Sequence, residues 1–158
     1  MDEYEECVQV APNTFRDYGG TSRFSGWVET IKCLENNPLV RERLTTEDGN
    51  GRVLVVDGGG SIRCALMGDQ LATAACENGW KGVIVNGAIR DSVEIGRLSF
   101  GCKALCSNPC KSKKISPGER DVPLTFAGLQ FRPGQYVYCD EDGIVVSDKK
   151  LELPRPKI

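Results

Sequence analysis

The feature that most constrains the fold is a pair of continuous apolar runs separated by one helical segment. The runs "RVLVVD" at 52–57 and "KGVIVNG" at 81–87 are rich in β-branched residues and lack polar alternation, which is typical of strands buried on both faces. Between them, "GDQLATAACENG" at 68–79 predicts a helix that begins at an Asp69 cap and stops at Gly79. This order of strand, helix and strand predicts a parallel βαβ unit.

Further strands and one more helix are predicted around this unit. We expect a strand within 24–35 and a helix at about 38–46 that has Pro38 at its first position. After residue 97 the chain breaks into short alternating strands, which is typical of antiparallel hairpins. The dipeptides that separate these strands are Ala127-Gly128, Pro133-Gly134 and Asp142-Gly143.

Two segments predict little regular structure. Residues 1–23 have weak periodicity and indicate a loop with a short helical turn, and "CKSKKISPGER" at 110–120 indicates a basic, polar loop. No internal repeat or linker divides the 158 residues. We therefore expect a single domain over 1–158 of mixed α/β class, with a parallel layer, an antiparallel layer and helices on one side.

The chain contains no histidine, which excludes Ser-His-Asp and Cys-His catalysis and His-ligated zinc. A net charge of −2 gives no basic face for nucleic acid, and no apolar run approaches the roughly 20 residues of a membrane span. The acidic start "MDEYEE" lacks the layout of a secretory signal, so we expect a cytoplasmic protein. The end, Pro156-Lys157-Ile158, resembles a peroxisomal-type address only loosely, because its proline departs from that signal.

Eight cysteines are present, and in a chain without a secretory signal we expect them to be reduced thiols. Cys102, Cys106 and Cys110 are spaced by four and suggest a metal cluster at first sight. No Cys-x-x-Cys pair accompanies them, and Pro109 interrupts the run. The pattern therefore favours small apolar core residues over a metal site.

The glycine-rich stretch "VVDGGGSIRC" at 55–64 follows a predicted strand, as a dinucleotide-binding loop would. It departs from that fingerprint, because Arg63 stands where the third glycine belongs and no acidic residue ends the next strand at Val85. A tight turn is the better interpretation, and we expect no nucleotide cofactor.

Three carboxylates and one arginine gather around the predicted βαβ unit. Asp69 opens the helix, and Arg90, Asp91 and Glu94 follow the second strand, so all lie beyond the carboxyl ends of parallel strands, where α/β proteins hold ligands. Carboxylates without histidine suit Mg²⁺ or Mn²⁺, and the helix amides at 68–71 suit an anion. A surface ion pair of Arg90 with Asp91 or Glu94 explains the spacing equally well, and both interpretations stay open.

These residues carry a resemblance to a known family. "NGRVLVVDGGGSIRCALMGDQLATAACENGWKGVIVNGAIRDSVEI" closely resembles the family that contains the regulator of ribonuclease activity A and the 4-hydroxy-4-methyl-2-oxoglutarate aldolases. The likeness continues through "FSGWVETIKCLENN" and "YVYCDEDGIVVS" and covers nearly the whole chain, with the family's amino-terminal helix absent or shortened. The resemblance implies a three-layer β/β/α swivelling-domain-like fold, with a central largely parallel sheet and a second antiparallel layer, and a homotrimer.

The resemblance further implies a catalytic member of the family. Catalytic members carry Asp-x20-Arg-Asp or Gly-x20-Arg-Asp-x2-Glu/Asp, whereas the ribonuclease-binding type lacks the aspartate after the arginine. This chain reads Asp69-x20-Arg90-Asp91-x2-Glu94. The implied activity is that of a class II, divalent-metal aldolase, which cleaves the small 2-keto acid 4-hydroxy-4-methyl-2-oxoglutarate to two pyruvates and decarboxylates oxaloacetate.

Roles for individual residues follow from this interpretation. Asp91 is expected to hold Mg²⁺ or Mn²⁺, with Asp69 and Glu94 acting directly or through waters. Arg90, which together with Asp69 forms the expected catalytic pair, binds the keto acid and stabilises the charge that develops on its oxygen. The backbone amides expected to take the substrate carboxylate are those of Gly68, Asp69, Gln70 and Leu71.

Two alternatives remain at this level. A Schiff-base mechanism would need a desolvated lysine, for which Lys32 and Lys81 are candidates that no pattern singles out. A non-catalytic protein that binds and inhibits a ribonuclease would use the acidic amino-terminal segment or the loop at 110–120 as its surface.

Overall fold

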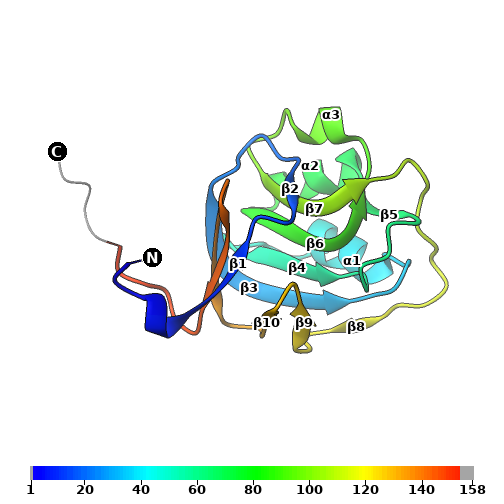
Figure 1. Ribbon diagram of the computed structural model, residues 1–158. Coiled ribbons are helices and arrows are strands. Elements are labelled where there is room, and N and C mark those ends of the chain that lie inside the picture. Colours follow the sequence, from blue (N-terminus) through cyan, green and yellow to red (C-terminus); the bar gives the residue numbers. More distant parts are fainter. Residues whose placement is uncertain (1, 154–158) are drawn as a thin grey trace.

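The computed structural model describes residues 2–153, and within them twelve strands and four short helices form one domain (Figure 1). The end 156–158 lies outside the described residues. The helices are the 3₁₀ turn η1 (Glu5–Cys7), α1 (Pro38–Thr46), α2 (Asp69–Glu77) and α3 (Ser92–Ile95). The strands are β1 (Val8–Pro12), β2 (Arg16–Asp17), β3 (Phe24–Lys32), β4 (Val53–Asp57), β5 (Ala65–Met67), β6 (Gly82–Ile89), β7 (Gly101–Ser107), β8 (Glu119–Arg120), β9 (Leu124–Phe126), β10 (Leu129–Phe131), β11 (Tyr136–Asp140) and β12 (Gly143–Ser147).

The parallel βαβ unit predicted from the two apolar runs is confirmed. β4 and β6 pair in parallel from Val53 opposite Gly82 to Asp57 opposite Asn86. β3 and β7 extend this parallel sheet on either side, and every residue of β4 is buried. Burial on both faces explains why the strand sequence shows no polar alternation.

Alternate residues of β4 enter two separate cores. Leu54 and Val56 pack with the buried side chains of α1 and α2, which cover one face of the sheet (Figure 1). Val53 and Val55 lie in a second core that contains residues of the antiparallel strands and of the β9–β10 hairpin. The parallel strands are therefore covered by helices on one face and by β-structure on the other.

The predicted antiparallel layer is present, but it is not a separate sheet. Within the described residues, ten strands form one mixed sheet in the order β1-β12-β11-β3-β4-β6-β7-β2, with β5 and β8 off this path. β3 joins the two parts, since residues 24–27 pair antiparallel with β11 whereas 28–32 pair parallel with β4. β3 has nine residues, which is long enough to pair with β11 in one half and with β4 in the other. The fold is thus mixed α/β, as expected.

Several short elements were missed by the sequence interpretation. The segment 1–23, predicted as loop, contains β1 and β2, which pair with β12 and β7 at the two ends of the sheet. β5 lies between the glycine loop and α2, and β8 closes the segment predicted as the loop 110–120. β2, β5 and β8 have only two or three residues, too few for a periodic pattern, and long-range pairing decides them.

The boundaries of α2 correct one expectation. Gly79, with φ of +85°, follows the helix as predicted. The N-cap is Gly68 rather than Asp69, and no side chain caps the helix. Asp69 is instead the first helical residue, and its carboxyl group interacts with Asp91.

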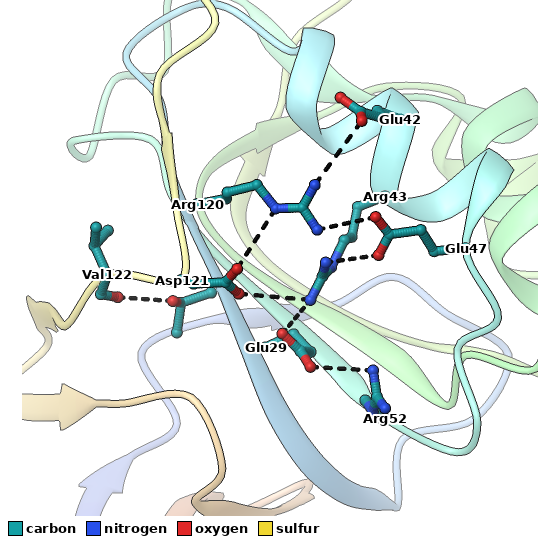
Figure 2. A network of polar contacts seen from close by, with 9 residues as sticks. Glu29, Glu42, Arg43, Glu47, Arg52, Arg120, Asp121 and Val122 are labelled. Atoms are coloured by element: carbon teal, nitrogen blue, oxygen red, sulfur yellow. Dashed lines mark hydrogen bonds and ion pairs between the residues drawn. The ribbon is translucent and has the colours of Figure 1, made fainter.

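A network of ion pairs fixes α1 against the sheet (Figure 2). The buried guanidinium of Arg43 contacts Glu29 of β3, and its Nη1 lies 2.6 Å from Glu47 Oε2. Arg120 of β8 approaches the same Glu47 at 2.9 Å, and Arg52 approaches Glu29 at 3.1 Å. The network joins the carboxyl-terminal half of α1 to β3 and β8, whereas the amino-terminal end of α1 reaches the site described below.

Half of the cysteines are core residues as expected, whereas Cys76 and Cys106 are half-buried and Cys7 and Cys110 are exposed. All eight are free, and Cys33, Cys64, Cys102 and Cys139 are buried. Burial raises the pKa of the Cys102 thiol to about 12. In the described part of the chain, no group of three or more Cys, Asp or Glu side chains is placed to hold a metal ion, so Cys102, Cys106 and Cys110 do not form a cluster. Among residues 2–153, no helix is long and apolar enough to cross a membrane.

Candidate active site

The glycine loop after β4 forms a tight turn that is held from within. Asp57, the last residue of β4, accepts hydrogen bonds at Oδ1 from the Gly59 amide and from Asn86 Nδ2, both at 2.9 Å. Gly59 and Gly60 have φ of +68° and +74°, which L-residues with side chains rarely adopt. The loop is therefore a tight turn, and the Asp57 carboxylate makes its hydrogen bonds within this turn.

Arg90 and Asp91 follow β6, on the same edge of the sheet. The Arg90 amide donates to the Met67 carbonyl of β5 at 2.9 Å, which continues the β5–β6 pairing. Asp91 then adopts a left-handed conformation with φ of +57° and caps α3. Aspartate tolerates this region better than most residues, and such backbone strain is frequent at functional sites.

The turn directs the Asp91 carboxylate at the start of α2. Its Oδ2 accepts a hydrogen bond of 3.0 Å from the Asp69 amide. A Cβ at Gly68 would lie 2.5 Å from the same oxygen and 3.2 Å from Arg90 Nε. Only glycine at 68 leaves room for this carboxylate and guanidinium beside the helix start.

The two aspartates influence each other's ionisation. A hydrogen bond between the two carboxyl groups, together with desolvation and the negative charge of Asp91, raises the pKa of Asp69 above its usual range. The Asp69 amide, the interaction with the Asp69 side chain and the charge of Arg90 lower the pKa of Asp91. Paired carboxylates separate their pKa values in this way, and such pairs concentrate at functional sites.

Arg90 forms only a loose ion pair with its neighbour. Its Nε lies 3.9 Å from Asp91 Oδ2, and its side chain is 43% exposed. At this separation the guanidinium keeps donors free for another anion. The surface ion pair of Arg90 with Asp91 is therefore present but weak, and it does not engage all of the Arg90 donors.

Glu94 is not brought into a three-carboxylate cluster. It is exposed on the short helix α3, and it acts on Asp69 only through its charge, as the weakest of several effects that raise the pKa of Asp69. In residues 2–153, Asp69, Asp91 and Glu94 do not form a group placed to hold a metal together. The left-handed turn at Asp91 directs that side chain to α2, while Glu94 continues along α3.

Two of the four helix amides expected to bind a carboxylate are already engaged. The Asp69 amide donates to Asp91, and the Gln70 amide hydrogen bonds with the Asp69 carboxyl group. The pairing of Asp91 with the first turn of α2 therefore replaces part of the predicted anion site.

A cleft of about 360 Å³ contains these groups. Gly68, Asp69, Gln70, Leu71, Arg90 and Asp91 line it, as the sequence predicted for one edge of the sheet. Its remaining walls come from segments that we did not predict at the site. The lining residues of these segments are Asn37, Arg41, Ala65, Met67, Lys111, Ser112 and Lys114.

The only sequence signal for these extra walls is the basic composition of 110–120, which was interpreted as a loop. Two of its lysines line the cleft, and Arg41 joins them from α1. Four cationic side chains thus surround two carboxylates, in a chain whose net charge is −2. This excess of positive charge suits an anionic ligand. Lys32 and Lys81, the lysines considered for a Schiff base, do not line this cleft.

Sequence comparison relates the chain to one family. Residues 1–146 match the family model described as "RraA-like: Aldolase/RraA". A protein of Dechloromonas aromatica (strain RCB) is 51% identical, with 95% of this chain and 94% of that protein covered. A protein of Pseudomonas fluorescens (strain Pf0-1) is 48% identical over 97% of this chain and 93% of its own. Both are provisionally named as 4-hydroxy-4-methyl-2-oxoglutarate aldolases.

Two solved structures superpose closely and have other names. The RNA-processing inhibitor RraA of Thermus thermophilus has a TM-score of 0.92 at 42% identity, covering 96% of this chain and 92% of its own. A Geobacillus kaustophilus HTA426 protein described as an S-adenosylmethionine:2-dimethylmenaquinone methyltransferase has a TM-score of 0.91 at 50% identity, covering 95% and 92%. Names thus differ among proteins that share this fold, so the activity has to be argued from the site.

Proposed function

Because the chain belongs to the RraA-like family, we propose that it is a divalent-metal-dependent carbon–carbon lyase that cleaves 4-hydroxy-4-methyl-2-oxoglutarate and decarboxylates oxaloacetate. In both reactions the bond that breaks leaves its electrons on a pyruvate enolate. The observation that carries the proposal is the meeting of Asp69, Arg90 and Asp91 in one cationic cleft. The resemblance described above assigns these three residues to the motif of the family's catalytic members.

The residues present fit a hard divalent cation. Magnesium in proteins is held by one or two carboxylates, with water and substrate oxygens completing its shell, and Asp69 and Asp91 offer two. The hydrogen bond with Asp91, desolvation and the negative charge of Asp91 raise the pKa of Asp69, and a bound cation would offset that negative charge. Asp91 would hold the metal, with Asp69 beside it and Glu94 acting only through water. When bound, Mg²⁺ or Mn²⁺ polarises the keto oxygen of the substrate.

The protein's own groups then bind and orient the keto acid. Arg90 presents a planar guanidinium that pairs with a carboxylate and stabilises the negative charge that develops on the keto oxygen. Because Gly68 has no side chain, the first turn of α2 can lie directly against Arg90 and Asp91. Leu71, one of the four residues whose amides we first expected to take the carboxylate, lines the same cleft.

A coupled assay of pyruvate formation tests the proposal. Oxaloacetate and 4-hydroxy-4-methyl-2-oxoglutarate are supplied with Mg²⁺, and the assay is repeated with EDTA. We expect turnover of both that EDTA abolishes and added metal restores. Borohydride treatment with pyruvate should give no adduct, because we assign no lysine to the chemistry. A covalent product would replace the metal mechanism by a Schiff base.

The likeness to the Thermus thermophilus RNA-processing inhibitor favours a second candidate, a regulator that binds a ribonuclease. Retention of Asp91 argues for catalysis, although one protein can do both. Absence of metal-dependent turnover, combined with inhibition of a ribonuclease by the purified protein, would decide for the regulator.

Three broader expectations belong to the same proposal. The swivelling-domain fold name is supported by the two-core arrangement around the parallel strands. A homotrimer is expected from the family and can be measured by light scattering after gel filtration. Cytoplasmic location is an expectation that fractionation of cells would test.

A further inference from the structure

The segment that follows β7 runs beside the segment that leads into β5 (Figure 1). Ala65 and Lys111 form a parallel bridge between the two segments. Asn108 Nδ2 donates to the Ile62 carbonyl at 2.7 Å, and at both contacts the partners are 46 residues apart in the chain. The two segments are therefore held in a single register on both sides of the residues that lie between these contacts.

That register places Cys64 opposite Cys110. Each cysteine comes directly before one member of the Ala65–Lys111 bridge, and side chains opposite each other in a parallel pair point to the same side. The Ala65 amide donates to the Cys110 carbonyl at 2.8 Å, so the two backbones are in contact at this point. Neighbouring strands lie about 4.8 Å apart, which falls within the range of about 4.4–6.8 Å between Cα atoms that a disulfide spans.

The two thiols differ in exposure. Cys110 is exposed, whereas only 8% of Cys64 is exposed. Desolvation and the negative charges of Glu35 and Cys110 raise the pKa of the Cys64 thiol, and the effect of Cys110 is a second sign that the two thiols are close. An accessible cysteine beside a second cysteine that can react with it is typical of redox-sensitive sites.

Cys33 is a competing partner for Cys64. Burial, together with the charges of Asp57 and Cys64, raises the pKa of the Cys33 thiol to about 12, so Cys33 also lies near Cys64. Both of these thiols are buried, however, and a buried thiol with a raised pKa is inert. An oxidant from solution therefore reaches Cys110 first.

We propose that Cys64 and Cys110 form a reversible disulfide when the protein meets a hydroperoxide. The Cys110 sulfur attacks one peroxide oxygen, the O–O bond breaks, and Cys110 becomes a sulfenic acid as the first water leaves. The Cys64 sulfur then attacks the sulfenic sulfur, the S–S bond forms, and a second water leaves with the Cys64 proton. Two thiols and hydrogen peroxide thus give one disulfide and two waters, and a dithiol reverses the reaction.

The disulfide acts on the cleft because it lies next to one of its walls. Ala65 and Lys111, the next residues along the two segments, both line the cleft. The Lys113 amide already donates to the Glu35 carbonyl at 2.8 Å. A covalent bond adds to these hydrogen bonds and suppresses local opening of the wall that carries Lys111. The resting protein keeps its free thiols, and oxidation fastens the wall.

A count of free thiols tests the disulfide. The reduced full-length chain is treated with a small excess of hydrogen peroxide, unfolded, alkylated with N-ethylmaleimide and weighed by mass spectrometry. We expect eight labels before oxidation, six after it, and eight again after dithiothreitol, with a single chain on a non-reducing gel. Eight labels after a large excess of peroxide, sulfinic acid without a cross-link, or a cross-link between two chains would overturn the proposal.

The chain offers matched controls for the two cysteines. Trypsin leaves Cys64 in one peptide with Cys76, and Cys110 in one peptide with Cys106. The cross-link between these peptides should form in Cys76→Ser and in Cys106→Ser, and it should be absent from Cys64→Ala and Cys110→Ser. Cys110→Ser changes an exposed residue, so it tests the proposal even where Cys64→Ala fails to fold. Any disulfide that forms in Cys110→Ser, as a bond between Cys33 and Cys64 would, contradicts the assignment.

Limited proteolysis of the folded protein measures the effect on the cleft wall. Lys111, Lys113 and Lys114 are exposed, and trypsin cleavage after them follows local opening of the segment. We expect cleavage at least about threefold slower in the oxidised protein than in the reduced protein. Peroxide should not change the rate in Cys110→Ser. Equal rates in the two redox forms of the unchanged protein would overturn the coupling between the disulfide and the cleft.

Discussion

Two arginines of helix α1 lie two residues apart and have opposite surroundings. Arg43 is buried and contacts carboxylates of Glu29, Glu47 and Asp121. Arg41 is exposed, lines the cleft and forms no salt bridge with the described residues. Positions two apart point to different sides of a helix, so one short helix serves both regions. Arginine is thus structural where the protein supplies its counter-charges, and it is available for a ligand where the protein does not.

The largest effect is expected at the cleft. Asp91→Asn keeps the shape of the side chain but removes the charge that a hard cation needs, so metal-dependent turnover should fall to background while the fold survives. Circular dichroism and the coupled pyruvate assay measure the two properties separately. Glu94→Gln should retain most activity, because Glu94 lies outside the Asp69–Asp91 pair. Loss of activity in Glu94→Gln with an active Asp91→Asn would reverse the ligand assignment.

The next largest effect belongs to the ion-pair network. Arg43→Gln leaves Glu29 without its buried partner, and we expect the free energy of unfolding to fall by about 3–5 kcal/mol. Arg41→Gln, two residues away, should change it by no more than about 0.5 kcal/mol, since no pair is broken. Urea denaturation of both variants makes the measurement. Similar losses in the two would remove the distinction between the paired and the unpaired arginine.

Replacement of the arginine beside Asp91 tests whether its guanidinium acts on the reaction. A lysine at position 90 carries the charge but not the planar fork, so Arg90→Lys should lower kcat by about 10²–10³, or about 2.7–4 kcal/mol in activation free energy. Stability should change little, because the ion pair with Asp91 is long. Steady-state kinetics on oxaloacetate check the prediction. Near-normal turnover would show that Arg90 forms only a surface ion pair and does not act on the reaction.

A smaller effect is expected from a methyl group at the helix start. In Gly68→Ala the new Cβ would lie 2.5 Å from Asp91 Oδ2, and the carboxylate can move away more easily than a backbone can. We therefore expect a drop in activity of about tenfold with a change in unfolding free energy below about 1 kcal/mol. A variant that is fully active would show that the position of Asp91 is not critical.

The smallest effect concerns the pKa of Asp69. Its folded-state pKa is raised by Asp91, so Asp69 stabilises the fold at acid pH and this contribution is lost as pH rises through its folded pKa. The effect of Asp91 on stability has the opposite pH dependence, because its folded-state pKa is lowered. Its stabilising contribution is lost as pH falls through that pKa. In metal-free Asp91→Asn, the pKa of Asp69 should move down towards its usual range. Carbon-13 NMR titration of the Asp69 carboxyl group measures this shift.

The sequence by itself determined the elements whose signal is local. The buried runs, the helix 38–46, the stop at Gly79 and the late hairpins are visible because propensity and period are set by near neighbours. The meeting of Asp69 with Arg90 and Asp91 was also predictable. Parallel strands bring their carboxyl ends to one edge, and only that rule is needed.

Tertiary structure decided what depends on distant segments. Lys113 is bonded to Glu35 and Cys110 to Ala65, and these contacts turn a basic loop into a wall of the cleft. Nothing in the local pattern of 110–120 indicates this, because the partners lie far away in the chain. The left-handed turn at Asp91 likewise directs its carboxylate to α2 and leaves Glu94 outside. Local sequence places residues at the edge of a sheet, and long-range hydrogen bonds decide which of them share a cleft.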